Sequence, residues 1–188
     1  MNKLFVMIFL LFTSISQIYG ANKTLYFKDW SKSPEWGMEM DIYTKAINKK
    51  NDSFRIILDD EGNKIISIII FDEKLKKIFL KQPLNFTLFE GKDNLNSFER
   101  DFVSLEISLK YEDYKTSVMV SREGLLELYI SSENEKLEDI LSIIRRSSSF
   151  GIEIGHRYSG DRSTVYTASY SSKGFTAAEK ALLAEYNK

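Results

Sequence analysis

The 188-residue chain contains no cysteine, one histidine and only two prolines. Without cysteine it can have no disulfide framework, no thiolate metal site and no lipid-modified cysteine anchor. A single histidine cannot supply the several ligands that zinc requires, so we expect no metal and no other cofactor. The formal net charge of −1 gives no basic excess that would attract phosphate backbones. We therefore expect no nucleic-acid partner.

One apolar run near the start has the form of a secretion signal. Lys3 gives a weakly positive beginning, residues 4–12 are apolar, and a more polar stretch leads to Gly20 and Ala21. These are the three parts of a signal peptide, with cleavage after Gly20 or Ala21. The apolar core is shorter than the roughly 20 residues of a membrane-spanning helix. We expect residues 1–20 to be removed, leaving a periplasmic or secreted protein with no integral membrane segment.

The rest of the chain, residues 21–188, has the size of one domain and contains no linker or repeat. Of the 13 Phe and 10 Tyr in the whole chain, 10 Phe and 9 Tyr lie in this part and can fill a core, and we expect Trp30 to be buried. Residues 65–71 are a nearly unbroken apolar run typical of a central strand, and residues 102–109 alternate strictly between polar and apolar. Residues 78–80 indicate a further short strand. Short strands at this spacing predict a mainly β fold, an antiparallel β-sandwich.

Two helices are predicted toward the C-terminus. Ser132 followed by Glu135 has the spacing of a capping box, and apolar residues then recur at helical spacing, which predicts a helix at residues 133–146. Thr176 and Glu179 form a second such pair at the start of a C-terminal helix. The two helices are expected to cover parts of the sandwich.

The segment before the C-terminal helix contains a distinctive motif. Its residues are Tyr170-Ser171-Ser172-Lys173-Gly174-Phe175-Thr176-Ala177-Ala178. It resembles the terminal Ser-Leu-Lys-Gly-Phe-Thr-Ala-Ala signature of the invasion-associated locus B family of exported bacterial proteins. The expected order of a helix and two strands before the motif also fits, so the resemblance covers the last third of the chain. It departs from the family in lacking the cysteines that pair there.

The resemblance implies a β-sandwich in the periplasm or at the cell surface, a link to host-cell interaction and no known enzymatic chemistry. It transfers no catalytic residue to this chain. The motif also has a purely structural interpretation. Gly174 lets the chain turn, Phe175 packs against the start of the helix, and Thr176 caps it.

The densest group of polar side chains lies at residues 155–163. Arginine and tyrosine are common interface anchors, so we predict a binding patch there. Its members are His156, Arg157, Tyr158 and Arg162. A hydrolase would need a nucleophile held against His156, and closeness along a loop does not provide that geometry. The chain has no Gly-x-Ser-x-Gly nucleophile pattern. We assign no catalytic residue and expect no enzyme.

These features favour an exported bacterial envelope protein that acts as a non-enzymatic binding or interaction module with a protein partner. Three alternatives remain open. A periplasmic inhibitor or chaperone-like binder of another envelope protein would have a stoichiometric partner and an exposed strand edge. A small hydrolase would use His156. A carrier of a small apolar ligand would hold it inside the sandwich.

Overall fold

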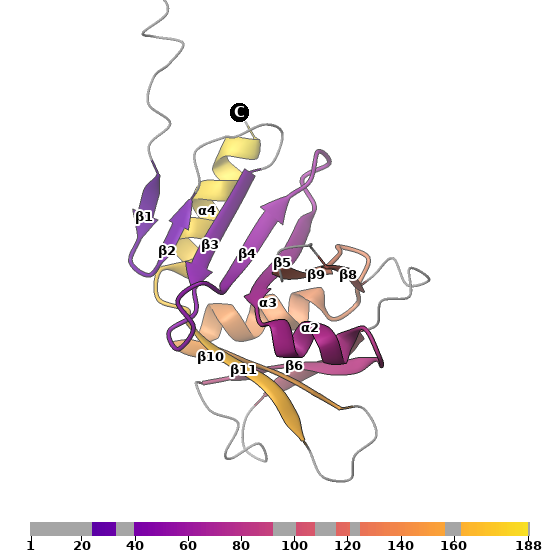
Figure 1. Cartoon of the computed structure of the whole chain (residues 1–188). Helices are drawn as coiled ribbons and strands as arrows, with labels where there is room; N and C mark the ends of the chain where they lie inside the picture. Colours follow the sequence, from indigo (N-terminus) through magenta and orange to yellow (C-terminus); the bar gives the residue numbers. More distant parts are fainter. Residues whose placement is uncertain are drawn as a thin grey trace, which may run out of the picture.

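The computed structural model describes residues 24–32, 40–91, 101–107, 116–120, 125–156 and 163–187. The expected signal peptide at residues 1–20 lies outside these ranges. Within them the chain is mainly β, with two antiparallel sheets packed together and three helices (Figure 1). The predicted β-sandwich fold is confirmed. None of the helices in the described ranges is both long enough and apolar enough to cross a membrane.

The larger sheet has seven strands in the order β1-β2-β3-β4-β5-β9-β8. Their bounds are Leu25–Phe27 (β1), Trp30–Lys32 (β2), Met40–Lys45 (β3), Ser53–Leu58 (β4), Lys64–Phe71 (β5), Thr116–Val120 (β8) and Leu125–Ile130 (β9). The predicted central strand, β5, lies between β4 and β9. Its inward side chains Ile66, Ile68 and Ile70 are fully buried, whereas Ile65 and Ile69 on the opposite face are half-buried. This face alternation is that of an antiparallel sheet with one core-facing side.

The smaller sheet has four strands in the order β11-β10-β6-β7. Their bounds are Leu84–Glu90 (β6), Phe102–Ile107 (β7), Ser149–His156 (β10) and Thr164–Ser171 (β11). The predicted alternation in β7 is observed, because Val103 and Ile107 are buried while Phe102 and Ser104 are exposed. The inward faces of both sheets supply the hydrophobic core.

Helix α2, Glu73–Phe79, was not predicted, and the strand expected at residues 78–80 is wrong. The Asp72 carboxylate accepts a hydrogen bond from the backbone N–H of Leu75 at 2.9 Å and so caps the helix. Leu75 and Phe79, one helical turn apart, are both buried. The short apolar stretch therefore completes one face of a helix instead of forming a strand.

Helices α3, Leu137–Arg146, and α4, Phe175–Tyr186, confirm the two predicted helices, but neither begins with a capping box. Residues 131–136 form turns in which the Asn134 side chain accepts from the backbone N–H of Lys136. Gly174 occupies the N-cap of α4 with φ +93, and Glu179 is engaged elsewhere. The capping-box spacing was present, but other contacts determine where both helices start.

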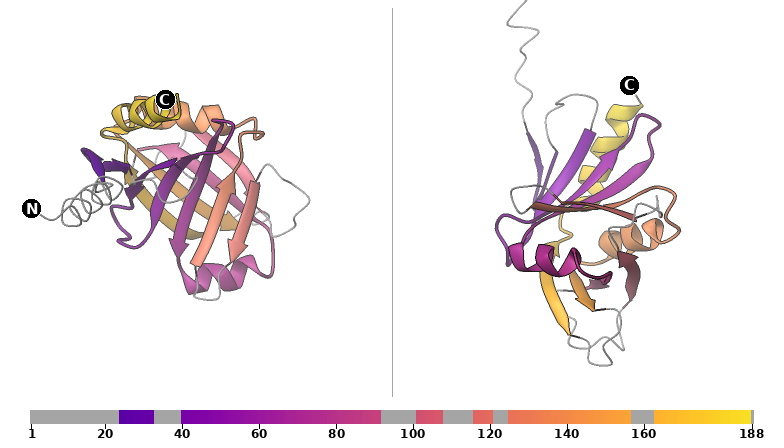
Figure 2. Two further views of the ribbon diagram at one scale, coloured as in Figure 1. Left: turned by 90° about the horizontal axis from the view of Figure 1, so that it is seen from above. Right: turned by 45° about the vertical axis from the view of Figure 1, so that its right-hand side comes forward.

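The two longer helices pack against the two sheets. Helix α4 contacts β1, β2 and β3 of the larger sheet, α3 contacts β6, β7 and β10 of the smaller sheet, and the helices touch each other. Figure 2 shows them together along one side of the crossing sheets. This arrangement brings the C-terminal helix beside the first strands of the described chain.

An aromatic cluster joins the two sheets where β4 faces β10 and β11. Its members are Trp30, Phe54, Phe150, Tyr170 and Phe175, all fully or almost fully buried. Ring centroids are 4.9 Å apart for Phe54 and Phe150, and 5.2 Å apart for Phe150 and Tyr170. Burial of each ring stabilises the fold by roughly 2–3 kcal/mol. The burial predicted for Trp30 is confirmed.

Candidate functional site

The β1–β2 hairpin is fixed to the turn between β11 and α4. The indole Nε1 of Trp30 donates a hydrogen bond to the carbonyl oxygen of Ser171 at 2.9 Å. Its ring centroid lies 4.8 Å from that of Phe175, the first residue of α4. Because an indole N–H that is buried needs an acceptor, this one side chain both packs and positions the hairpin.

Close backbone contacts reinforce the same junction. A Cβ atom on Gly174 would lie 1.8 Å from the carbonyl oxygen of Phe27, so only glycine fits there. The backbone N–H of Asp29 donates to the carbonyl of Lys173 at 3.3 Å, and the Ser171 hydroxyl donates to the Asp29 carboxylate at 2.5 Å. The motif at residues 170–178 thus forms the surface on which the hairpin lies.

The turn after β3 closes the other side. The backbone N–H of Ile47 donates to the carbonyl of Ser169 at 2.7 Å, and the N–H of Ser169 donates to the Asn48 side chain at 3.0 Å. These bonds satisfy backbone groups at the edge of β11. The larger sheet is therefore hydrogen-bonded to the smaller one at this corner.

A cavity of about 690 Å³ lies between these two connections; we name it the junction pocket. It is an open cleft lined by β1, β2, β3 and the ends of β10 and β11. Its charged side chains are Lys28, Lys45, Lys173 and Asp29. Its hydroxyl groups come mainly from Tyr26, Ser31, Tyr43, Ser148, Ser149 and Ser171. The junction pocket thus combines ammonium groups, hydroxyls and two aromatic rings.

The junction pocket carries positive charge in a chain that is slightly acidic. Three lysines against one aspartate leave an excess of two positive charges among the described residues of its lining. Lys28, Lys45 and Lys173 are exposed, and no acidic side chain in the described part of the chain forms an ion pair with them. Their ammonium groups are therefore available to a ligand.

The predicted binding patch can be placed only through His156, because Arg157, Tyr158 and Arg162 lie outside the described residues. His156 is the last residue of β10, and its Nδ1 is hydrogen-bonded to the Nε2 amide nitrogen of Gln82. Ser149, at the other end of this strand, lines the junction pocket. Seven strand steps of about 3.3 Å separate them by about 23 Å. His156 and the junction pocket therefore lie at opposite ends of β10.

Sequence reasoning missed the junction pocket because its residues come from four separate segments. Residues 26–31, 43–47, 148–149 and 171–173 contain no dense charge cluster in the sequence. The only sequence signal in this region is the motif at residues 170–178, which resembles a family signature. Gly174 and Ser171 of this motif contact the hairpin.

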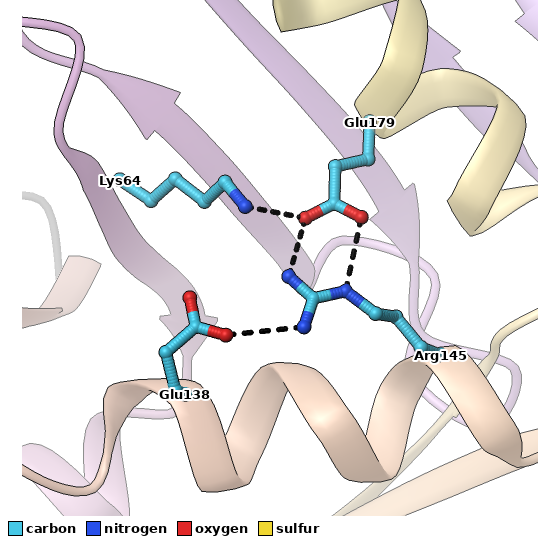
Figure 3. A network of polar contacts seen from close by, with 4 residues as sticks. All are labelled: Lys64, Glu138, Arg145 and Glu179. Atoms are coloured by element: carbon cyan, nitrogen blue, oxygen red, sulfur yellow. Dashed lines mark hydrogen bonds and ion pairs between the residues drawn. The ribbon is translucent and has the colours of Figure 1, made fainter.

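A second group of charges joins α3, α4 and β5 (Figure 3). The Glu179 carboxylate, whose side chain is 8% exposed, accepts from Arg145 at 2.7 and 3.1 Å and from Lys64 at 2.7 Å. Arg145 also donates to Glu138 at 3.1 Å. Burial opposes ionisation of Glu179, but hydrogen bonds from Arg145 and Lys64 outweigh it and lower the pKa of Glu179. The hydrogen bond to Glu179 likewise raises the pKa of Arg145. We name these four residues the helix clamp.

A buried carboxylate connects β4, β5 and β11. Asp52 accepts from the backbone N–H of Phe71 at 2.9 Å and from the hydroxyl of Tyr166 at 2.5 Å. The ammonium group of Lys49 lies 4.6 Å from the centre of the Tyr166 ring. Burial, followed by the neighbouring Tyr170 and Asp52, raises the pKa of Tyr166. The hydrogen bonds to both carboxylate oxygens indicate a structural role.

No metal centre is formed by the described residues, since they contain no group of three or more His, Asp or Glu side chains able to hold an ion. In comparisons with known proteins, no family model, curated protein or solved structure matches the chain. The resemblance to the invasion-associated locus B family therefore stays a prediction.

Proposed function

We propose that the chain is an exported, non-enzymatic binding protein of the bacterial envelope and that it holds its ligand in the junction pocket. The observation that carries this proposal is the cavity with three ammonium groups that form no ion pair with a described acidic side chain. Its volume of about 690 Å³ lies within the usual range of ligand pockets, roughly 300–1,000 Å³. Export rests on the apolar run at residues 4–12.

The chemistry of the lining favours binding over catalysis. Its described residues offer many hydrogen-bond donors but no histidine, and the one carboxylate among them, Asp29, accepts from the hydroxyl of Ser171. A serine and an aspartate without an intervening base do not make an activated nucleophile. At His156, the described partner of the imidazole is the Gln82 amide and not a hydroxyl group. We therefore prefer a binding role to a hydrolase that uses His156.

The inhibitor or chaperone-like role keeps one supporting observation. Strand β8 ends the larger sheet, and among the described strands only β9 pairs with it. An unpaired strand edge can accept an added strand from a partner protein. This alternative predicts a stable complex whose formation does not depend on the junction pocket.

A thermal-shift screen of the mature chain against a defined library of sugars, amino acids, nucleotides and organic acids tests the pocket. The filled-pocket variant is Ser31→Trp, and the matched control is Ser104→Trp on the exposed face of β7. A bound compound at saturating concentration should raise Tm by about 5 °C in the native chain and the control. It should have no effect on Ser31→Trp.

Two outcomes would count against the proposal. In one, no compound stabilises the native chain. In the other, the same compounds stabilise Ser31→Trp equally well, which would place their site elsewhere. A His156→Ala variant belongs in the screen, because the proposal expects its response to equal that of the native chain.

A further inference from the structure

We infer that the ligand of the junction pocket is an acidic sugar, meaning a sugar with carboxylate, phosphate or sulfate groups beside its hydroxyls. This inference rests on the proposed function and specifies its ligand class. The charge of the pocket lining indicates the charge of the ligand. Lys28, Lys45 and Lys173 exceed Asp29 by two positive charges, and they reach the cavity from the hairpin turn, the end of β3 and the turn before α4. Lysines from three different segments around one cavity suit a ligand with at least two negative charges.

The carboxylate of Asp29 favours a ligand that also carries hydroxyl groups. Asp29 places a carboxylate among the lysines, and a carboxylate can only accept hydrogen bonds. A ligand with anionic oxygens alone would gain nothing from Asp29 and would be repelled by it. A sugar hydroxyl can donate to Asp29 and accept from serine and tyrosine hydroxyls such as those of Ser31 and Tyr43. The mixture of hydroxyls, ammonium groups and one carboxylate therefore matches a polyhydroxylated anion.

The tyrosine rings of the lining favour a ligand with a flat apolar face. Tyr26 and Tyr43 line the cavity, and Tyr26 is 74% exposed although it is aromatic. An aromatic face provides a flat apolar surface beside a polar hydroxyl tip, and the C–H face of a sugar ring can pack on it. A large side chain left open to solvent beside a cavity is available for such packing.

The volume of the cavity favours a ligand larger than a single ion. A water molecule occupies about 30 Å³ in the liquid, so a cavity of about 690 Å³ is far larger than a single phosphate or sulfate ion needs. It has room for one or two sugar rings. Size and hydroxyl content together favour the acidic sugar over a free inorganic anion.

Isothermal titration calorimetry of the mature chain tests this ligand class. The acidic probes are digalacturonic acid for carboxylate, glucose 1,6-bisphosphate for phosphate and a disulfated heparin disaccharide for sulfate. The comparison ligands are lactose, sodium sulfate and tetraglutamate. We expect at least one acidic sugar to bind with one-to-one stoichiometry and at least tenfold more tightly than every comparison ligand. Its affinity should fall as salt is raised.

Single variants assign the binding to the junction pocket. Lys28→Gln, Lys45→Gln and Lys173→Gln should each weaken the acidic sugar by about fivefold or more. Lys180→Gln, an equal charge change on the exposed side of α4, should leave the affinity within twofold. All four lysines are exposed, so their variants should keep the native Tm within a few degrees.

Several results would overturn the inference. Equal binding of lactose would show that charge is not recognised, and tighter binding of tetraglutamate would identify an acidic peptide as the ligand. Binding of sulfate alone would mean a simple anion site. In each case the pocket would still bind a ligand, so the proposed function would survive. Failure of all three acidic sugars also overturns the inference, and the library screen then decides separately whether the pocket binds anything.

Discussion

The Glu179 carboxylate on α4 accepts two hydrogen bonds from the guanidinium group of Arg145 on α3 (Figure 3). Two parallel hydrogen bonds between a guanidinium and a carboxylate fix the orientation of the two groups as well as the distance between them. Lys64 of β5 approaches the same carboxylate at 2.7 Å. Because α4 also begins with the Phe175 ring that packs on Trp30, the helix clamp holds α4 beside the hairpin whose residues line the junction pocket. Folding and the proposed binding site are connected through this helix.

Removal of the central carboxylate should destabilise the protein. Glu179→Ala leaves Arg145 and Lys64 without their shared partner in a largely buried place, and we expect a loss of about 2–3 kcal/mol in the free energy of unfolding. Glu138 is the control, since its side chain is 68% exposed and Glu138→Ala should cost less than about 0.5 kcal/mol. Urea denaturation of both variants measures the difference. Equal losses would show that the helix clamp contributes nothing specific.

The helix clamp should also make stability depend on acid pH. The folded-state pKa of Glu179 is lower than its ordinary value of 4.5, so its contribution is complete above that value and is lost as pH falls through the folded pKa. The difference in unfolding free energy between the native chain and Glu179→Gln should be constant from about pH 7 to pH 5 and shrink below about pH 4.5. A difference that grows on acidification would contradict this assignment.

At alkaline pH the buried Tyr166 should have the opposite effect. Burial raises its pKa above the ordinary value of 10.0, so the unfolded chain loses this proton first and stability declines as pH rises above that value. Tyr166→Phe loses the hydrogen bond to Asp52, which we expect to cost about 1–2 kcal/mol at neutral pH. Above pH 10 its stability should fall less steeply than that of the native chain. Thermal unfolding at several pH values measures both stabilities. If the stability of Tyr166→Phe and that of the native chain fell equally steeply above pH 10, this role would be refuted.

The close contact at Gly174 should tolerate no side chain. Gly174→Ala places a Cβ atom against the carbonyl oxygen of Phe27 at a positive φ, and we expect a loss of at least about 2 kcal/mol. Gly155→Ala is the matched control, because its φ is not in the positive region and the nearest atom to its Cβ would lie 3.4 Å away. Tryptophan fluorescence should change with Gly174→Ala, since the hairpin that carries Trp30 can no longer lie on the turn before α4. Native stability in Gly174→Ala would contradict the docked arrangement.

The sequence predicted those strands and helices whose apolar residues recur at a clear spacing. The apolar run of β5 and the alternation in β7 were sufficient to identify strands, and α3 was predicted from its apolar spacing. The start of α3 was not predicted correctly. The Asn134 side chain accepts from the backbone N–H of Lys136, and this contact replaces the expected cap by Ser132. Helix α2 was missed because a seven-residue helix has almost no periodicity, and its signal was the single capping residue Asp72.

The junction pocket could not be predicted from the sequence. Its lysines are far apart in the chain, and their segments meet through contacts such as the hydrogen bond from Trp30 to Ser171, which is 141 residues away. Local patterns contain no information on a contact of that sequence separation. The prediction of a patch at residues 155–163 had the opposite basis, since their polar side chains are adjacent in sequence. Only His156 of that predicted patch lies within the described residues.

Amide NMR spectra of the mature chain titrated with digalacturonic acid test the central claim most directly, because they locate a ligand as well as detect it. We predict that the largest shift changes fall at residues 26–31, 43–47 and 171–173, and that they disappear in Ser31→Trp. Changes confined to the region of His156, or no changes at saturating ligand, would contradict the claim that the junction pocket is the ligand site.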